Sequence, residues 1–172
     1  RAGFTEFLNS GALSDVTLLV GKRRYKVHRL ILAFSSDFFA SLLSTEFREK
    51  SQSEIELGFP DPKNVFPEVL HFMYSGRLDI TVGKVVAILA QAEQYLIKPL
   101  VARCREFIAK NINRNTVISL LLDGFAFHQD DLVEQCLLFL ATNFLHMAET
   151  TQYSSLGPSL FYRLVSHDRL VR

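Results

Sequence analysis

The sequence has 172 residues, of which 48% are hydrophobic and 22% are charged, as in an ordinary globular protein with one large domain or two small ones. The formal net charge is only +1, so the basic excess of a nucleic-acid-binding protein is missing and no nucleic-acid partner is expected. No apolar run approaches the ~18 residues of a membrane helix, and the N-terminus lacks a signal peptide. We therefore expect no membrane partner and an intracellular location, in the cytoplasm or the nucleus. The missing initiator Met and the abrupt end suggest an excised fragment.

The first predicted element is a short amphipathic helix at the N-terminus. Phe4, Phe7 and Leu8 are spaced i, i+3, i+4, and Gly11 ends the pattern. A segment this short is marginal alone, because helix nucleation is costly. A symmetric contact with the same stripe of a second copy would bury these three side chains, which predicts a homodimer.

Residues 15–28 have the alternating pattern of a hairpin that turns at Gly21. From Arg29 the spacing of apolar residues is helical up to residue 43, and Ser36 with its neighbours marks a second helix start. Residues 54–57, EIEL, alternate as a short strand.

The next segments are predicted to be helices that bury apolar faces. The first ends at Gly76 and has Pro67 in its first turn, because an interior proline costs ~3 kcal/mol. Residues 85–96 are apolar nearly all round and predict a buried helix, and another helix begins at Lys98. The first half is therefore an α+β fold, with a few short strands inside a shell of helices.

Beyond Asn111 the strand signals vanish, and residues 111–115 carry helix caps without an apolar pattern, so we place a domain boundary there. Two helices follow, and Asp130 or Asp131 can cap the second of them. A weaker helical segment comes after the break at Gly157.

No enzyme signature is found, because the sequence has no Gly-rich phosphate loop, GxSxG, HExxH or CxxC motif. The five histidines never pair with one another or with cysteine at metal-ligand spacing, so neither a metal nor a cofactor is expected. His28 lies among apolar neighbours and is predicted to be a hydrogen-bonded histidine rather than a catalytic base. Cys104 and Cys136 lie in apolar helical patterns and are predicted to be buried thiols.

Asp15 and Arg29 each stand at the edge of a strongly apolar element. A lone buried charge is costly, so we expect the two residues to pair with each other or to face a subunit boundary. The alternative is that they are two unrelated solvated residues.

Phe47 is a lone aromatic among Glu46, Arg48, Glu49 and Lys50, between two apolar patterns. An aromatic residue outside any core pattern and rimmed by charge has the character of an interaction hot spot. The alternative is that its ring turns back and closes the core under its own loop.

Four motifs in this order are similar to a family of known fold. SDVTLLV at 14–20, YKVHRLILAFSSDFFASLL at 25–43, the strand EIEL, and FPEVLHFMYSGRLDI at 66–80 closely resemble a BTB (POZ) domain. The resemblance covers residues 4–111 and implies domain bounds of 1–111. Residues 112–172 resemble, more loosely, the helical BACK region that follows BTB in kelch-like and speckle-type POZ proteins, and this region is expected to be incomplete.

The resemblance implies a protein-interaction adaptor rather than an enzyme. BTB proteins that recruit cullin-3 carry a hydrophobic-x-Glu triplet where Phe47, Arg48 and Glu49 stand, so these residues are expected to bind cullin-3 in a ubiquitin ligase complex. A domain outside the fragment would bind the substrate protein. Phe4, Phe7, Leu8, Asp15 and Arg29 are expected at the homodimer interface.

Two other functions of the same fold stay open. A corepressor-binding BTB domain of a transcriptional regulator would use the groove near Asp15 and Arg29. A potassium-channel-type tetramerisation domain is the third possibility. Both are disfavoured by the BACK-like helices.

Overall fold

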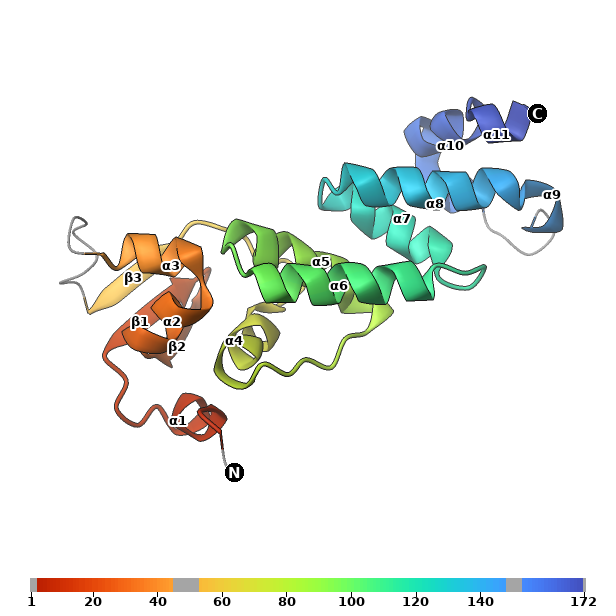
Figure 1. Cartoon of the computed structure of the whole chain (residues 1–172). Helices are drawn as coiled ribbons and strands as arrows, with labels where there is room; N and C mark the ends of the chain where they lie inside the picture. The colour runs from red at the N-terminus through yellow and green to blue at the C-terminus, as the bar shows by residue number, and fades with distance from the viewer. Residues whose placement is uncertain (1–2, 45–52, 148–152, 172) are drawn as a thin grey trace. The chain divides into compact units, whose positions relative to one another are not determined.

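The computed structural model of the chain describes residues 3–44, 53–147 and 153–171 (Figure 1). Backbone contacts divide the chain into two units, and each is described by itself. Unit 1 comprises residues 1–80 and 87–104, and unit 2 comprises residues 81–86 and 105–172. The fold is α+β, with short strands and many helices, as the sequence predicts.

The sheet of unit 1 has three strands in the order β2-β1-β3. The predicted hairpin forms from β1 (Val16–Val20) and β2 (Arg23–Val27), which are antiparallel, and β3 (Glu54–Leu57) runs parallel to β1. Gly21 adopts φ +61°, a conformation that glycine reaches without steric cost, and this permits the tight turn. Alternate β1 residues are buried, so one face of the sheet belongs to the core.

The predicted helix break at Ser36 separates α2 (Arg29–Ser35) from α3 (Asp37–Leu42). The Ser36 hydroxyl accepts a hydrogen bond from the Phe39 N–H at 3.1 Å and donates one to the Tyr95 carbonyl at 2.5 Å. Phe39 stacks on the Tyr95 ring, with centroids 5.5 Å apart. Burial raises the pKa of Tyr95 above its ordinary value. Ser36 thus starts a helix and ties it to the aromatic core.

The third helix of this core is α4 (Phe66–Ser75), which has Pro67 in its first turn and ends at Gly76, as predicted. The Asp61 carboxylate accepts hydrogen bonds from the main-chain N–H groups of Val65 and Phe66, at 2.8 and 3.0 Å. These bonds satisfy N–H groups that a helix start leaves without partners.

Two long helices, α5 (Val82–Gln94) and α6 (Lys98–Asn111), contribute residues to both units. Residues 85–89 of α5 are all buried, as the nearly uniform apolar pattern predicts. Cys104 of α6 is buried as well.

Unit 2 pairs α7 (Val117–Ala126) with α8 (Asp130–Thr142). Gly124 allows their close approach, because a Cβ there would lie 3.3 Å from Leu132 side-chain atoms. The expected cap at Asp130 or Asp131 is wrong: both residues lie inside the first turn, and Gln129 holds the cap position. The remaining elements of this unit are α9 (Phe144–Met147), η2 (Tyr153–Leu156), α10 (Gly157–Val165) and α11 (Asp168–Val171).

No helix in the described ranges is long and apolar enough to cross a membrane. The described residues likewise contain no cluster of three or more His, Cys, Asp or Glu that could hold a metal ion.

Candidate interaction site

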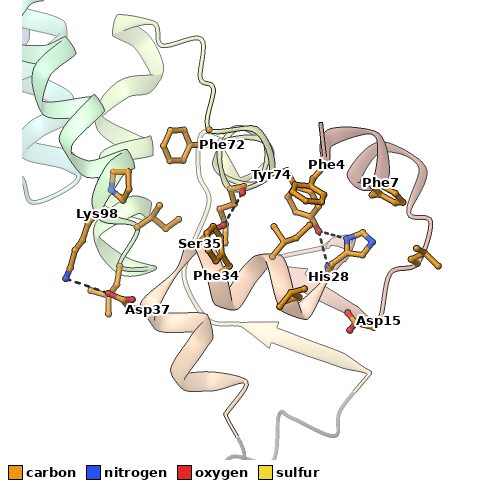
Figure 2. A pocket seen from close by; sticks show the side chains of 18 residues that line it. Phe4, Phe7, Asp15, His28, Phe34, Ser35, Asp37, Phe72, Tyr74 and Lys98 are labelled. Carbon is orange, nitrogen blue, oxygen red and sulfur yellow. Dashed lines mark hydrogen bonds and ion pairs between the residues drawn. The ribbon is translucent and has the colours of Figure 1, made fainter. Parts of the chain in front are cut away.

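Unit 1 has an open apolar groove with a volume of about 1130 Å³ (Figure 2). Its walls come from α1 (Thr5–Ser10), α2, α4 and the segment that joins α5 to α6. Helices separated in sequence thus meet at one hollow surface. A hollow of this size that stays open to solvent is typical of a binding surface.

The most exposed apolar side chains of the groove lie on α2. Phe34 is 90% exposed and Leu30 is 81% exposed, and their i, i+4 spacing places both on one side of the helix. The opposite side of α2 is anchored by Leu32, which is fully buried. Helix α2 therefore presents two large apolar side chains that no described part of the chain covers.

Helix α1 supplies the second apolar wall, and none of its residues is buried. Phe4, the residue just before α1, is 61% exposed, and Phe7 is 38% exposed; both line the groove. Leu8, the third member of the predicted stripe, is half-buried and is not among the lining residues.

Asp15 and Arg29 are joined by two hydrogen bonds within one chain. The Asp15 carboxylate accepts from the main-chain N–H of Arg29 at 2.9 Å, and the Arg29 guanidinium donates to the main-chain carbonyl of Asp15. Asp15 is exposed, so the expectation of a costly buried charge does not fit this residue in the single chain. The carboxylate instead satisfies a first-turn N–H of α2.

His28 lies where the groove meets α1 and α4. Its Nδ1 is 2.6 Å from the Tyr74 hydroxyl (Figure 2). Its Nε2 is 2.7 Å from the Ala12 carbonyl. The Tyr74 oxygen also accepts a hydrogen bond from the main-chain N–H of His28 at 3.0 Å. Burial raises the pKa of Tyr74 to about 12, so its hydroxyl keeps its proton at neutral pH. His28 is hydrogen-bonded, as the sequence predicts.

A polar rim borders the other end of the groove. Lys98 and Asp37 form an exposed ion pair at 3.8 Å, and the Ser35 hydroxyl donates to the Met73 carbonyl at 3.0 Å (Figure 2). Exposed ion pairs contribute little to stability. An apolar centre with a polar rim is the usual arrangement of a protein–protein interface.

The family model of the BTB/POZ domain matches residues 4–112. The chain belongs to the BTB/POZ family. The protein named ARM repeat protein interacting with ABF2, from Arabidopsis thaliana, is 34% identical over 140 residues, which are 81% of this chain and 19% of that protein. Kelch-like protein 22 from Homo sapiens is 28% identical over 168 residues, 98% of this chain and 26% of that protein.

Kelch-like protein 7 from Gallus gallus is 26% identical over 173 residues, which are 98% of this chain and 29% of that protein. The chain therefore spans less than a third of the length of each of these relatives. The two Kelch-like proteins align over unit 2 as well as over the BTB domain, because nearly the whole chain is matched.

The structure brings some of the predicted site residues of this BTB domain together. Phe4, Phe7 and Asp15 line one groove, whereas Leu8 and Arg29 stand outside its lining. Phe47, Arg48 and Glu49 lie outside the described residues, so their predicted role stays a prediction.

Leu30 and Phe34 are exposed groove-lining residues that sequence analysis did not single out. Both fit the apolar period of α2 and α3, and this pattern predicts burial. The sequence did contain one signal of this exposure. Helix α2 has apolar residues on more than one side, so contact with the core on one side cannot cover all of them.

Proposed function

We propose that this BTB domain is a non-enzymatic protein-interaction adaptor that forms a homodimer through the groove. One observation carries the proposal: Leu30 and Phe34 on α2 are almost fully exposed beside Phe4. Large apolar side chains that stay exposed in one hollow have an unfavourable free energy of hydration. A symmetric contact with a second copy would remove them from water. Asp15, Arg29, Phe7 and Leu8 are proposed to flank that contact.

The adaptor's second partner is proposed to be cullin-3, bound through Phe47, Arg48 and Glu49. Support comes from the sequence resemblance, in which this triplet takes the position of the cullin-binding residues. The division into a BTB domain at 1–111 and a BACK-like region at 112–172 belongs to the same proposal, and the first helices of that region are proposed to extend the contact. A substrate protein would be held by a domain outside this sequence, and the complex would act as a ubiquitin ligase.

Calorimetric titration with an N-terminal fragment of cullin-3 tests the role of the triplet. Truncating a central aromatic hot spot typically costs ~2 kcal/mol or more, so Phe47→Ala is expected to weaken binding roughly 30-fold. Glu49→Ala is expected to weaken it less, because a rim carboxylate stays partly solvated. Thermal unfolding of the same variants checks that the fold is intact.

The two interpretations of Phe47 separate in these measurements. A hot-spot ring contributes little to folding, whereas truncating a core phenylalanine costs ~3 to 5 kcal/mol. Full cullin-3 affinity with a large loss of stability would mean that Phe47 closes the core. No binding by the parent protein would remove cullin-3 from the proposal.

A further inference from the structure

The imidazole of His28 contacts the segment that carries α1 at two points. Its Nε2 is hydrogen-bonded to the Ala12 carbonyl, just beyond the end of α1, and its ring meets the Phe7 ring edge to face, with centroids 6.3 Å apart. Its second nitrogen reaches Tyr74 on α4. One side chain thus joins α1 and its following turn to α4.

The hydrogen bonds fix the tautomer of the imidazole. A carbonyl oxygen only accepts, so Nε2 carries the proton that is donated to Ala12. In the neutral ring Nδ1 then accepts a hydrogen bond from the Tyr74 hydroxyl. The Tyr74 oxygen accepts in turn from the His28 main chain. Every polar atom of this network has a partner when the ring is neutral.

Helix α1 needs such a contact, because it is six residues long and buries none of them. An isolated helix of this length is unstable in water. Its own end is closed by the Gly11 N–H, which donates to the Phe7 carbonyl at 2.9 Å. That bond lies within the α1 segment and does not set its orientation relative to α4.

We propose that His28 is the positioning residue for self-association: it holds α1 in the orientation that presents Phe4 and Phe7 at the groove. The inference rests on the proposed homodimer and adds the side chain that orients one of its walls.

Two variants of matched size separate the bonds of His28. His28→Gln places an amide N–H near the position of Nε2, within reach of the Ala12 carbonyl, whereas His28→Asn reaches only the position of Nδ1. Dimer dissociation constants are measured by sedimentation equilibrium at pH 7.5, and thermal unfolding monitors the fold. Hydrogen exchange of the Gly11 amide, corrected for intrinsic rates, reports on α1 directly.

His28→Asn is expected to weaken the dimer about tenfold and to speed exchange at Gly11, because it loses the hydrogen bond to Ala12. His28→Gln is expected to keep its affinity within about threefold of the parent, because its amide N–H still donates to that carbonyl.

A dimer with unchanged α1 exchange and unchanged affinity in His28→Asn would overturn the positioning role. Equal weakening of the dimer by His28→Gln and His28→Asn would mean that the hydrogen bond to Ala12 does not orient α1, and would also overturn it. A parent protein that is monomeric at every concentration would instead overturn the proposed homodimer, and the role of His28 in it.

Discussion

Asp15 and Arg29 interact through main-chain atoms, and this decides what each side chain contributes. The carboxylate of Asp15 binds the main-chain N–H of Arg29, and the guanidinium binds the main-chain carbonyl of Asp15. Each side chain therefore makes its own hydrogen bond, and that bond survives when the other side chain is truncated.

We expect Asp15→Ala to lower the free energy of unfolding by about 1 kcal/mol, the usual cost of losing a side-chain acceptor at a helix start. A double-mutant cycle with Arg29→Ala is expected to be nearly additive, because neither substitution removes the atoms that the other side chain binds. Urea denaturation measures both quantities. A cost of 3 kcal/mol or more with strong coupling would indicate a buried ion pair instead.

The two thiols are expected to be unreactive in the folded protein. Burial raises the pKa of Cys104 and of Cys136 to about 12 each, so almost no thiolate is present at pH 8. Iodoacetamide is expected to label both residues slowly in native protein and rapidly in 8 M urea, roughly 100-fold faster, as mass spectrometry would show. Rapid labelling of one native thiol would reveal local opening of the unit that holds it.

The same pKa shifts give the sign of a pH dependence. The thiols of the unfolded chain release their protons near their ordinary pKa, whereas the buried thiols keep theirs up to about pH 12. The folded state then binds more protons, so stability falls as pH rises between these values. Replacing both cysteines by Ser would remove this part of the dependence of stability on pH.

Helices α2 and α3 show which features of an element a sequence can predict. The break at Ser36 was predictable, because a serine before an acidic residue and an apolar run supplies a helix cap. The hairpin, the strand at 54–57 and the stop at Gly76 were predictable for similar reasons of period and turn chemistry. Each of these signals is local, and the structure confirms them.

The exposure of Leu30 and Phe34 was not predictable from that local pattern. Apolar spacing shows which side of a helix avoids water but not what covers it. Leu32 and Phe39 of the same stretch are fully buried, whereas Phe34 is 90% exposed. The difference arises from tertiary packing, and the exposed residues form the groove.

Among the polar residues of α2, α3 and the break between them, Ser36 is expected to cause the largest loss of stability when it is replaced. Ser36→Ala removes a hydrogen bond to the Phe39 N–H and another to the Tyr95 carbonyl, at a site 1% exposed. We expect a loss of about 2 kcal/mol in the free energy of unfolding. Ser159→Ala, on an exposed position of α10, is a matched control and is expected to change stability by less than about 0.5 kcal/mol. Equal effects of the two variants in urea denaturation would contradict the capping role.

For the whole molecule, the BTB/POZ family follows from the order of the motifs, and the family model matches residues 4–112. The groove depends on residues that are far apart in sequence, from Phe4 to Pro99, so it is a property of the folded unit. The chain aligns with less than a third of the length of each of these relatives.

The most direct test of the account is the mass of the protein in dilute solution, measured by sedimentation equilibrium. The parent is expected at twice the 19.6 kDa mass of the chain. Phe34→Asp and Leu30→Asp are expected to weaken the dimer at least 30-fold, because each buries a charge at the apolar centre of the contact. Leu145→Asp is the matched control, since Leu145 of α9 is 87% exposed but lies in unit 2.

The account predicts a dimer for the parent and the Leu145 variant, and a folded monomer with cooperative thermal unfolding for the two α2 variants. A monomeric parent would contradict it, and so would α2 variants that keep the mass of the dimer.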